Sequence, residues 1–270
     1  MNSILLAALS MGGIGLTFSI LLTIANHKLK VEEDPRITKV DEALPGANCG
    51  ACGYPGCAAC AEALVKGKVG IDVCPVCDDQ EREKIAEILG IELEEGKRKV
   101  AVLLCQGGNQ NVSNKAEYEG ISSCLAASFV NGGERACGYG CIGKGDCVEV
   151  CDFDAIYMGE EGLPVIDREK CTGCARCVEA CPRNIIELHP IDHHVFVLCK
   201  NQDKGADARK VCDRACIGCK ICEKFDKSGG FTVENFLASV DHDKYDKDFE
   251  LPTDKCPTDA IQLVGEKDEE

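Results

Sequence analysis

The sequence predicts an α+β protein with a single N-terminal transmembrane helix, a small helical domain and tandem small modules of short strands and helices. Three observations lead to this fold class. The chain has 270 residues, of which 22 are cysteine and none is tryptophan. Residues 4–25 form an uncharged apolar run. Further along, short apolar segments typical of strands alternate with clusters of cysteine, so several small cysteine-rich modules are expected.

The N-terminal run predicts a membrane anchor. As a helix, residues 4–25 would rise about 33 Å at 1.5 Å per residue, enough to cross the hydrocarbon core. Lys28 and Lys30 follow the run and no positive side chain precedes it, which places the bulk of the chain on the cytoplasmic side. We therefore expect residues 1–26 to be a single-pass helix in the inner or plasma membrane. A buried helix of a soluble protein and a cleaved signal peptide are the alternatives.

Cysteine at this density is typical of disulfide-linked secreted proteins, zinc proteins and iron–sulfur proteins. A cytoplasmic location disfavours disulfides, because the cytosol keeps thiols reduced. The formal net charge of −16 argues against nucleic acid as a partner, since phosphate binding requires clustered lysine and arginine. The sequence has no P-loop, GxGxxG fingerprint or nucleophile constellation, so we expect no catalytic residues and no substrate-reducing site.

The first cysteine cluster follows a charged connector, residues 27–44, which we interpret as a tether. Residues 45–97 are predicted to form a small helical domain with one [4Fe–4S] cluster. Its candidate ligands are Cys49, Cys52, Cys57 and Cys74. Three of these cysteines share a tight glycine-rich loop and a short helix returns the fourth, which suits a cubane cluster, although zinc also fits this spacing. Cys60 and Cys77 are left over and are expected to pack as small apolar side chains.

Residues 137–193 have the cysteine spacing of a bacterial two-cluster ferredoxin. The stretch CTGCARCVEACP, residues 171–182, matches C-x2-C-x2-C-x3-C-P, in which the first three cysteines bind one cluster and the fourth binds its neighbour. Residues 137–151 supply the other half, with longer gaps before the same ending. We expect one [4Fe–4S] cluster on Cys137, Cys141, Cys147 and Cys181. We expect the second on Cys151, Cys171, Cys174 and Cys177. Eight cysteines in this order disfavour zinc.

Residues 194–270 resemble a ferredoxin module that has lost one of its two clusters. Asp226 stands where the first half-motif should have its fourth cysteine, and Tyr245 stands where the second half-motif should begin. The remaining cysteines form one complete set. We expect a fourth [4Fe–4S] cluster on Cys216, Cys219, Cys222 and Cys256. A module without iron is the alternative, and Cys212 is a competing ligand.

Residues 98–136 are interpreted as a linking α/β segment. Within it KVAVLLC, residues 99–105, resembles HVFVLC, residues 194–199, because each is an apolar strand that ends in cysteine. Cys105, Cys124 and Cys199 have no obvious ligand spacing. We interpret them as core thiols, with the border of a partner site as the alternative.

Taken together, the residues indicate carriers of single electrons tied to a membrane. The order of an N-terminal membrane helix, a CGACGYPGC loop with a distant Cys74 and ferredoxin modules resembles the B subunit of the Rnf complex, the ion-translocating ferredoxin:NAD oxidoreductase. This resemblance covers nearly the whole chain. It implies that the protein accepts electrons from soluble reduced ferredoxin and passes them to the membrane and peripheral subunits of a translocase, where they reach NAD.

Two other functions remain open from the sequence. The chain could be a polyferredoxin subunit of a different membrane redox complex. It could also be a structural zinc scaffold, although the two-cluster spacing disfavours this reading of the cysteines.

Overall fold

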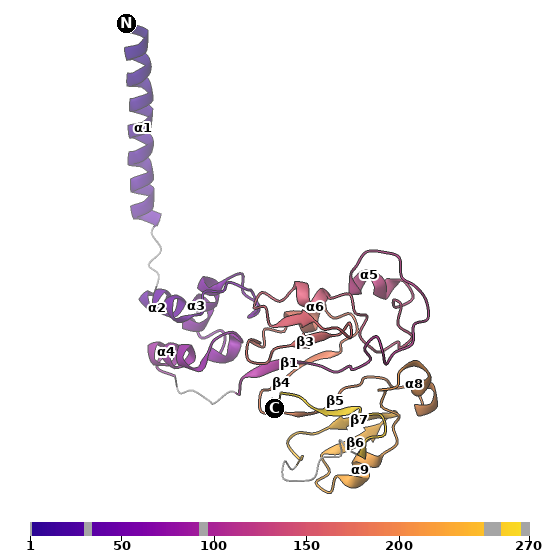
Figure 1. Ribbon diagram of the computed structural model, residues 1–270. Coiled ribbons are helices and arrows are strands. Elements are labelled where there is room, and N and C mark those ends of the chain that lie inside the picture. The colour runs from indigo at the N-terminus through magenta and orange to yellow at the C-terminus, as the bar shows by residue number, and fades with distance from the viewer. Residues whose placement is uncertain (1, 30–33, 92–96, 246–254, 266–270) are drawn as a thin grey trace.

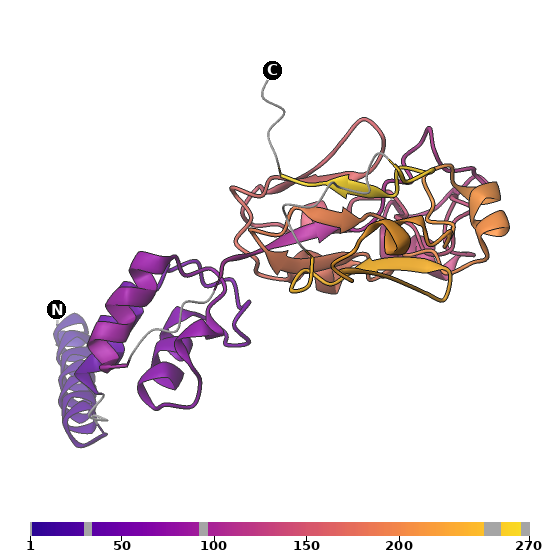
Figure 2. The same ribbon diagram turned by 90° about the horizontal axis from the view of Figure 1, so that it is seen from below.

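A computed structural model describes residues 2–29, 34–91, 97–245 and 255–265. Parts of the predicted tether, helical domain and C-terminal module lie outside these residues, namely 30–33, 92–96, 246–254 and 266–270. The chain forms an N-terminal helix, a small helical domain and two strand-containing modules (Figure 1). Both views show the helical domain at one side of the modules, with α1 projecting away from them (Figure 2).

The N-terminal helix α1 spans Asn2–Leu29. The predicted transmembrane helix is wrong, because no helix in the described part of the chain is both long and apolar enough to cross a membrane. Gly12, Gly13 and Gly15 of α1 contribute no apolar side chain. The Thr17 hydroxyl donates to the carbonyl of Gly13 at 2.8 Å.

The helical domain consists of α2 (Pro35–Ala43), α3 (Cys57–Val65), the 3-10 turn η1 (Ile71–Val73) and α4 (Asp79–Leu89). Part of the predicted tether is thus helical, because Asp34 caps α2 and Pro35 suits its first turn. Helix α4 begins at a capping box between Asp78 and Glu81 and ends at Gly90 in the left-handed conformation. The predicted short helix between the third and fourth candidate ligands is confirmed as α3.

The first module contains two antiparallel strand pairs and two short helices. Strand β1 (Lys99–Leu103) pairs with β4 (Ile186–Pro190), and β2 (Ile156–Met158) pairs with β3 (Pro164–Ile166). Helices α6 (Asp146–Glu149) and α7 (Arg176–Ala180) each follow a cysteine-bearing loop. A further helix, α5 (Cys124–Phe129), lies in the segment between β1 and α6. Because β1 pairs with β4, the strand predicted for the linking segment is part of this module's sheet.

The second module repeats this pairing scheme. Strand β5 (Val195–Val197) pairs with β8 (Ile261–Leu263), and β6 (Phe231–Glu234) pairs with β7 (Leu237–Val240). Helix α8 (Gly205–Val211) follows β5, and α9 (Ile221–Phe225) precedes β6. In each module the first strand therefore pairs with the last and the two middle strands form a hairpin. The resemblance between residues 99–105 and 194–199 has its structural counterpart in β1 and β5.

The two modules are joined by apolar and polar contacts. Val102 and Leu104 pack against Phe196, which is 1% exposed. Arg168 of the first module donates hydrogen bonds to the carbonyls of Val264 at 2.8 Å and Ile191 at 2.6 Å. Because the guanidinium bridges backbone from both modules, it fixes the last strand, β8, beside the first module.

A cluster of three histidines also lies at this junction. His189 on β4, His193 after it and His242 after β7 bring ring nitrogens within 4.8 Å of one another. The rings of His193 and His242 stack with centroids 3.9 Å apart, and Phe196 contacts the His242 ring at 5.1 Å. Burial, with the neighbouring His193 and His189, lowers the pKa of His242 to about 4, against the opposing effect of Asp241 and Asp243. This packing favours the neutral imidazole.

We predict that acid weakens the junction through His242. The folded protein keeps this imidazole neutral down to about pH 4, whereas the unfolded chain takes up the proton near pH 6.5. Stability is therefore lost as pH falls below about 6.5. Since the side chain is half-buried, solvent screening limits the effect to about 1 kcal/mol, or roughly 2–4 °C in Tm for a chain of this size.

Thermal unfolding of the anaerobic full chain at pH 7.5 and 5.5 measures this loss. His242→Phe keeps an aromatic ring but cannot titrate, so its Tm should fall less between the two pH values. His194→Gln is the control and should keep the wild-type difference. An equal pH dependence in all three proteins would contradict the assignment to His242.

Candidate iron–sulfur sites

All 22 cysteines lie in the described residues and all are free thiols. Six belong to the helical domain. The other sixteen line four cavities of about 320–370 Å³ in the described part of the modules. The structure therefore gathers the cysteines into groups, and none of these groups is closed by a disulfide.

One cavity of about 320 Å³ has the four cysteines predicted for the second ferredoxin cluster. They are Cys151, Cys171, Cys174 and Cys177. The loop before α7 supplies Cys171 and Cys174, α7 itself supplies Cys177, and Cys151 arrives from the end of α6. The Ala101 N–H on β1 donates to the Cys171 sulfur at 3.3 Å. Arg98 donates to the Cys171 carbonyl at 2.8 Å, so the start of β1 positions this loop.

The neighbouring cavity, about 370 Å³, differs in one residue from the predicted set. Its cysteines are Cys124, Cys141, Cys147 and Cys181. The structure places Cys137 in a different cavity and brings Cys124 here from the start of α5. Cys147 on α6 lines this cavity, and Cys151 just after α6 lines the other. At α7 the order is reversed, because Cys177 lines the other cavity and Cys181 lines this one.

Asp146 explains how Cys124 reaches this cavity. Its carboxylate accepts hydrogen bonds from the backbone N–H groups of Cys124 at 2.7 Å and Leu125 at 3.0 Å, and from the Ser123 hydroxyl at 2.9 Å. Burial opposes ionisation of Asp146, but the hydrogen bonds from the Leu125 and Cys124 backbone outweigh it and lower the pKa below its usual value. Because Asp146 precedes Cys147, it holds the first turn of α5 against α6.

The second module has a cavity of about 360 Å³ lined by all four predicted cysteines. They are Cys216, Cys219, Cys222 and Cys256. Backbone N–H groups donate to two of the sulfurs, from Ala238 to Cys216 at 3.4 Å and from Ala260 to Cys256 at 3.3 Å. Such donors stabilise sulfur ligands of iron–sulfur clusters and tune their potential.

Asp226 and Tyr245 occupy the half of this module where the sequence lacks cysteines. The Asp226 carboxylate is 6% exposed and accepts hydrogen bonds from the Ser228 side chain and from the Phe231 N–H at 2.7 Å. The Tyr245 ring packs edge-on against Phe231 with centroids 5.7 Å apart. A satisfied carboxylate and an aromatic pair therefore replace metal ligands there.

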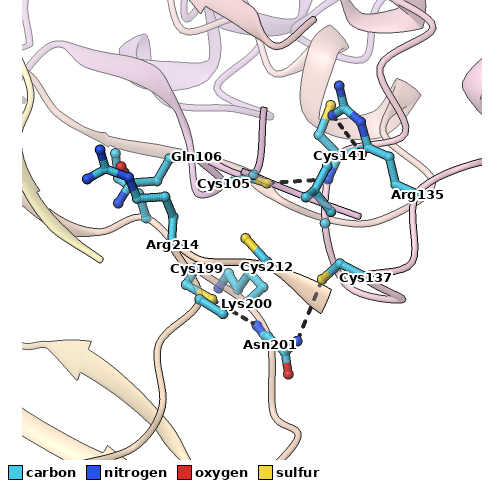
Figure 3. A pocket seen from close by; sticks show the side chains of 15 residues that line it. Cys105, Gln106, Arg135, Cys137, Cys141, Cys199, Lys200, Asn201, Cys212 and Arg214 are labelled. Atoms are coloured by element: carbon cyan, nitrogen blue, oxygen red, sulfur yellow. Dashed lines mark hydrogen bonds between the residues drawn. The ribbon is translucent and has the colours of Figure 1, made fainter. Parts of the chain in front are cut away.

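The fourth cavity, about 370 Å³, lies between the two modules and was not predicted. Figure 3 shows the sulfurs of four cysteines directed into it, and Cys141 lies at its edge. The four are Cys105, Cys137, Cys199 and Cys212. The sequence signal that could have found it was the repeat, because both similar segments end in cysteine. Cys124 has no comparable signal, since it lies far from any cysteine spacing motif.

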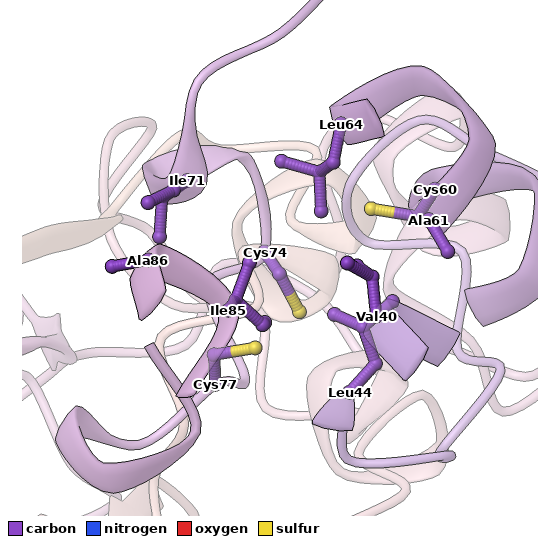
Figure 4. Packing of buried hydrophobic residues seen from close by; sticks show 10 residues of the cluster. All are labelled: Val40, Leu44, Cys60, Ala61, Leu64, Ile71, Cys74, Cys77, Ile85 and Ala86. Carbon is purple, nitrogen blue, oxygen red and sulfur yellow. The ribbon is translucent and has the colours of Figure 1, made fainter. Parts of the chain in front are cut away.

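The helical domain brings five of its six cysteines to one small core. Val40, Leu44, Leu64 and Ile85 surround Cys60, Cys74 and Cys77 (Figure 4). The Asn48 side chain accepts a hydrogen bond from the Cys57 N–H at 2.8 Å, which closes the loop that carries the first three predicted ligands.

Cys60 and Cys77 act as hydrogen-bond donors to predicted ligands. A hydrogen bond from the Cys77 thiol, with the N–H groups of Val76 and Cys77, outweighs burial and lowers the pKa of Cys74 to about 6. The same bond raises the pKa of Cys77. Burial, with the charge and hydrogen bond of Cys52, raises the pKa of Cys60 to about 12. Cys74 is thus the thiolate and Cys77 the thiol of their pair.

The chemistry of these cysteines fits an iron–sulfur cluster better than a single zinc ion. Burial raises the pKa of Cys177 to about 12 and of Cys222 to about 11, so thiolates there require a cation beside them. Tetrahedral zinc at about 2.3 Å from each sulfur needs sulfurs about 3.8 Å apart. Among the described residues, the group of three side chains placed to hold a single metal ion consists of histidines and includes no cysteine. The cysteine groups therefore fit a larger cofactor such as a cubane better than one ion.

Comparisons with known proteins agree with this chemistry. The FeS family of Fe-S cluster domains matches residues 44–76, and the 4Fe-4S dicluster domain family matches residues 138–188. The B component of the sodium-translocating ferredoxin:NAD(+) oxidoreductase complex of Acetobacterium woodii is 47% identical over 97% of this chain and 78% of its own. The B component of the ion-translocating oxidoreductase complex of Methanosarcina acetivorans is 40% identical over 90% and 93%. The B component of the proton-translocating ferredoxin:NAD(+) oxidoreductase complex of Clostridium ljungdahlii is 38% identical over 98% and 94%.

We predict that Asp146→Ala releases α5 and with it Cys124. The loss of three hydrogen bonds to a carboxylate should lower the free energy of unfolding by about 1–3 kcal/mol and reduce bound iron by up to one cluster. Glu149→Ala, an exposed carboxylate on the same helix, is the control. Iron per chain and thermal unfolding of anaerobic protein measure both effects. Wild-type iron in Asp146→Ala would show that Cys124 is not a ligand.

Proposed function

The chain belongs to the family of B subunits of ion-translocating ferredoxin:NAD(+) oxidoreductase complexes, the Rnf complexes, and we propose that it takes electrons from reduced ferredoxin at its C-terminal module and relays them toward its N-terminal domain. The protein is an iron–sulfur electron-transfer subunit of such an oxidoreductase complex, and its partners are the other subunits. The observation that carries the proposal is the row of cysteine-lined cavities through both modules.

We propose [4Fe–4S] clusters at four of the cysteine groups. The helical domain would bind one through Cys49, Cys52, Cys57 and Cys74. The first module would bind one through Cys151, Cys171, Cys174 and Cys177, and another through Cys124, Cys141, Cys147 and Cys181. The second module would bind one through Cys216, Cys219, Cys222 and Cys256. Each bound cluster supplies one-electron redox chemistry, and the crossing of α6 and α7 ligands supports close spacing of the central pair.

The face around Cys219 fits the docking of an acidic electron donor. Cys219 is the exposed cysteine of the set. Exposed lysines follow it along the chain at Lys220, Lys224 and Lys227, and exposed Lys255 lies over the Phe225 ring at 6.0 Å. Since the chain as a whole carries a net charge of −16, an acidic donor would be repelled elsewhere and attracted here. Phe225 and Phe236 are 49% and 46% exposed beside these lysines, and exposed aromatic side chains are common anchors of protein interfaces.

The backbone at Phe236 supports this role. Asn235 and Phe236 form the two-residue turn between β6 and β7, and both have positive φ, 48° and 62°. A bulky residue in this conformation is strained, because its Cβ crowds the backbone where glycine would not. Retaining phenylalanine in an exposed turn at this cost is consistent with a contact outside the chain.

We further propose that the complex acts at a membrane, since translocation of an ion requires one. The other subunits would then supply the ion path, and this chain would reach the membrane by binding them. Relatives named for sodium and for protons match this chain at 47% and 38% identity. This similarity favours subunits other than this one as the site where the ion is selected.

The N-terminal ligand set can be tested with two adjacent cysteines. Cys74→Ala removes a proposed ligand and should lower iron by up to one cluster. Cys77→Ala removes only a hydrogen bond to that ligand, so iron should be kept. The reduction potential of the cluster should fall by about 40 mV, because the lost hydrogen bond stabilises the reduced cluster by about 1 kcal/mol. The conversion uses 59 mV per tenfold change for one electron. Iron analysis and redox titration distinguish the two variants, and equal iron loss in both would contradict the assignment.

The donor face can be tested by charge reversal. Lys224→Glu/Lys227→Glu should slow reduction of the full chain by reduced ferredoxin about tenfold at low salt, because steering is lost, and the difference should shrink with added salt. Lys39→Glu/Lys84→Glu, on the exposed surface of α2 and α4, is the control. Phe236→Gly should relieve the strained turn and raise Tm while still slowing reduction. Unchanged rates in both test variants would place the donor elsewhere.

A further inference from the structure

We propose that Cys105, Cys137, Cys199 and Cys212 bind an additional [4Fe–4S] cluster between the two modules. Their cavity, about 370 Å³, matches the three other module cavities, which measure about 320–370 Å³. The site is assembled from both modules, so neither module contains it alone. With this group, every cysteine of the modules belongs to a four-cysteine set.

The four cysteines come from equivalent positions of the two modules. Cys105 follows β1 and Cys199 follows β5, the first strand of each module. Cys137 and Cys212 each precede a cysteine that lines a neighbouring cavity, Cys141 in the first module and Cys216 in the second. Each module thus contributes one strand-end cysteine and one loop cysteine.

The hydrogen bonds at the site repeat in the same way. The Cys141 N–H donates to the Cys105 sulfur at 3.4 Å, and the Cys216 N–H donates to the Cys199 sulfur at 3.3 Å. Asn201, which is 1% exposed, donates from its side chain to the Cys137 sulfur at 3.6 Å. N–H groups directed at cysteine sulfur are the donors that iron–sulfur ligands use.

Glycines make room for the sulfurs. A Cβ at Gly107 would lie 3.3 Å from the Cys212 sulfur and 3.7 Å from the Cys105 sulfur. A Cβ at Gly140 would lie 3.4 Å from the Cys137 sulfur. A Cβ at Gly138, in contrast, would meet no atom within 4 Å. The backbone therefore approaches the ligand sulfurs at both glycines, and at Gly107 a Cβ would be tighter than an ordinary contact.

The arrangement of the four cysteines favours a cluster over a single ion. Cys199 and Cys212 line the cavity from the second module, and Cys105 and Cys137 line it from the first. Buried Arg135 lines the cavity with one positive charge and donates to the carbonyls of Cys141 and Gly162. Within the described residues, the group of three side chains placed to hold a single metal ion includes no cysteine, so these cysteines fit a larger cofactor better than one zinc ion.

The position of the site gives it a role in the relay, and this part of the inference rests on the proposed function. Cys141 borders both this cavity and the next cavity of the first module. On the other side, Ala215 lines this cavity and Cys216 lines that of the second module. One electron leaving the reduced cluster on Cys216 would oxidise that cluster and reduce this one, which would then pass it to the first module. No bond forms or breaks.

Chemical analysis of the full chain tests the binding site directly. Five clusters in total correspond to about 20 iron and about 20 acid-labile sulfide per chain, whereas four correspond to about 16 of each. Cys105→Ala/Cys212→Ala removes one ligand from each module and should lower both counts by about four, with a matching loss of EPR spins after reduction. A wild-type count near 16 that the double variant does not lower would overturn the inference.

A matched pair of glycine variants tests the site without removing cysteine. Gly107→Ala should lower the iron count toward that of the double variant, and Gly138→Ala should keep the wild-type count. Stopped-flow reduction by ferredoxin tests the relay. In the double variant the second module should be reduced at the wild-type rate, and the first module should be reduced at least tenfold more slowly. If the first module were reduced at the same rate in the wild type and the double variant, the relay role would be overturned. The iron count separately decides whether the site binds a cluster. Protein without iron at any site would refute the proposed function as well.

Discussion

Buried cysteine sulfur is the constraint on which both modules depend. The first module encloses two cavities and the second module one, each of about 320–370 Å³. Cysteines are part of the apolar core of both modules, and the strands have only three to five residues. Such short pairs bury little apolar surface on their own. Binding of iron by thiolates is therefore expected to contribute a large part of the folding free energy, as in other small metal-binding domains.

The repeat of the strand pairing explains why the modules meet as they do. In both modules the first strand pairs with the last, so β1 and β5 hold equivalent places. Packing of Val102 on Phe196 and the bridge made by Arg168 bring these strands together. The cysteines that end the two strands then face a common space, which a single module could not enclose.

The sequence was informative where chemistry is local and uninformative where it depends on contacts between distant segments. The cysteines of CTGCARC lie together in the structure because they are only three residues apart on one short segment. At this spacing their side chains can reach few places other than a common site. Cys124 was missed because its place depends on Asp146, 22 residues later. The pairing of β1 with β4 joins residues almost ninety positions apart, so the linking segment was not recognised as part of a sheet. For α1, apolar composition was overvalued as evidence for a membrane span.

The distribution of exposure indicates a direction for the relay. Cys219 is exposed, while the cysteines of the central cavities are buried or half-buried, so access from solvent is greatest at the second module. At the opposite end, Thr172 and Gly173 of the first module line a cleft together with Val76 and Cys77 of the helical domain. Electron transfer depends on short distances between carriers. Because the central cysteines are shielded from solvent and Cys219 is exposed, an external donor can approach most closely at Cys219. Under the proposed function, the helical domain would be the side from which electrons leave for the other subunits.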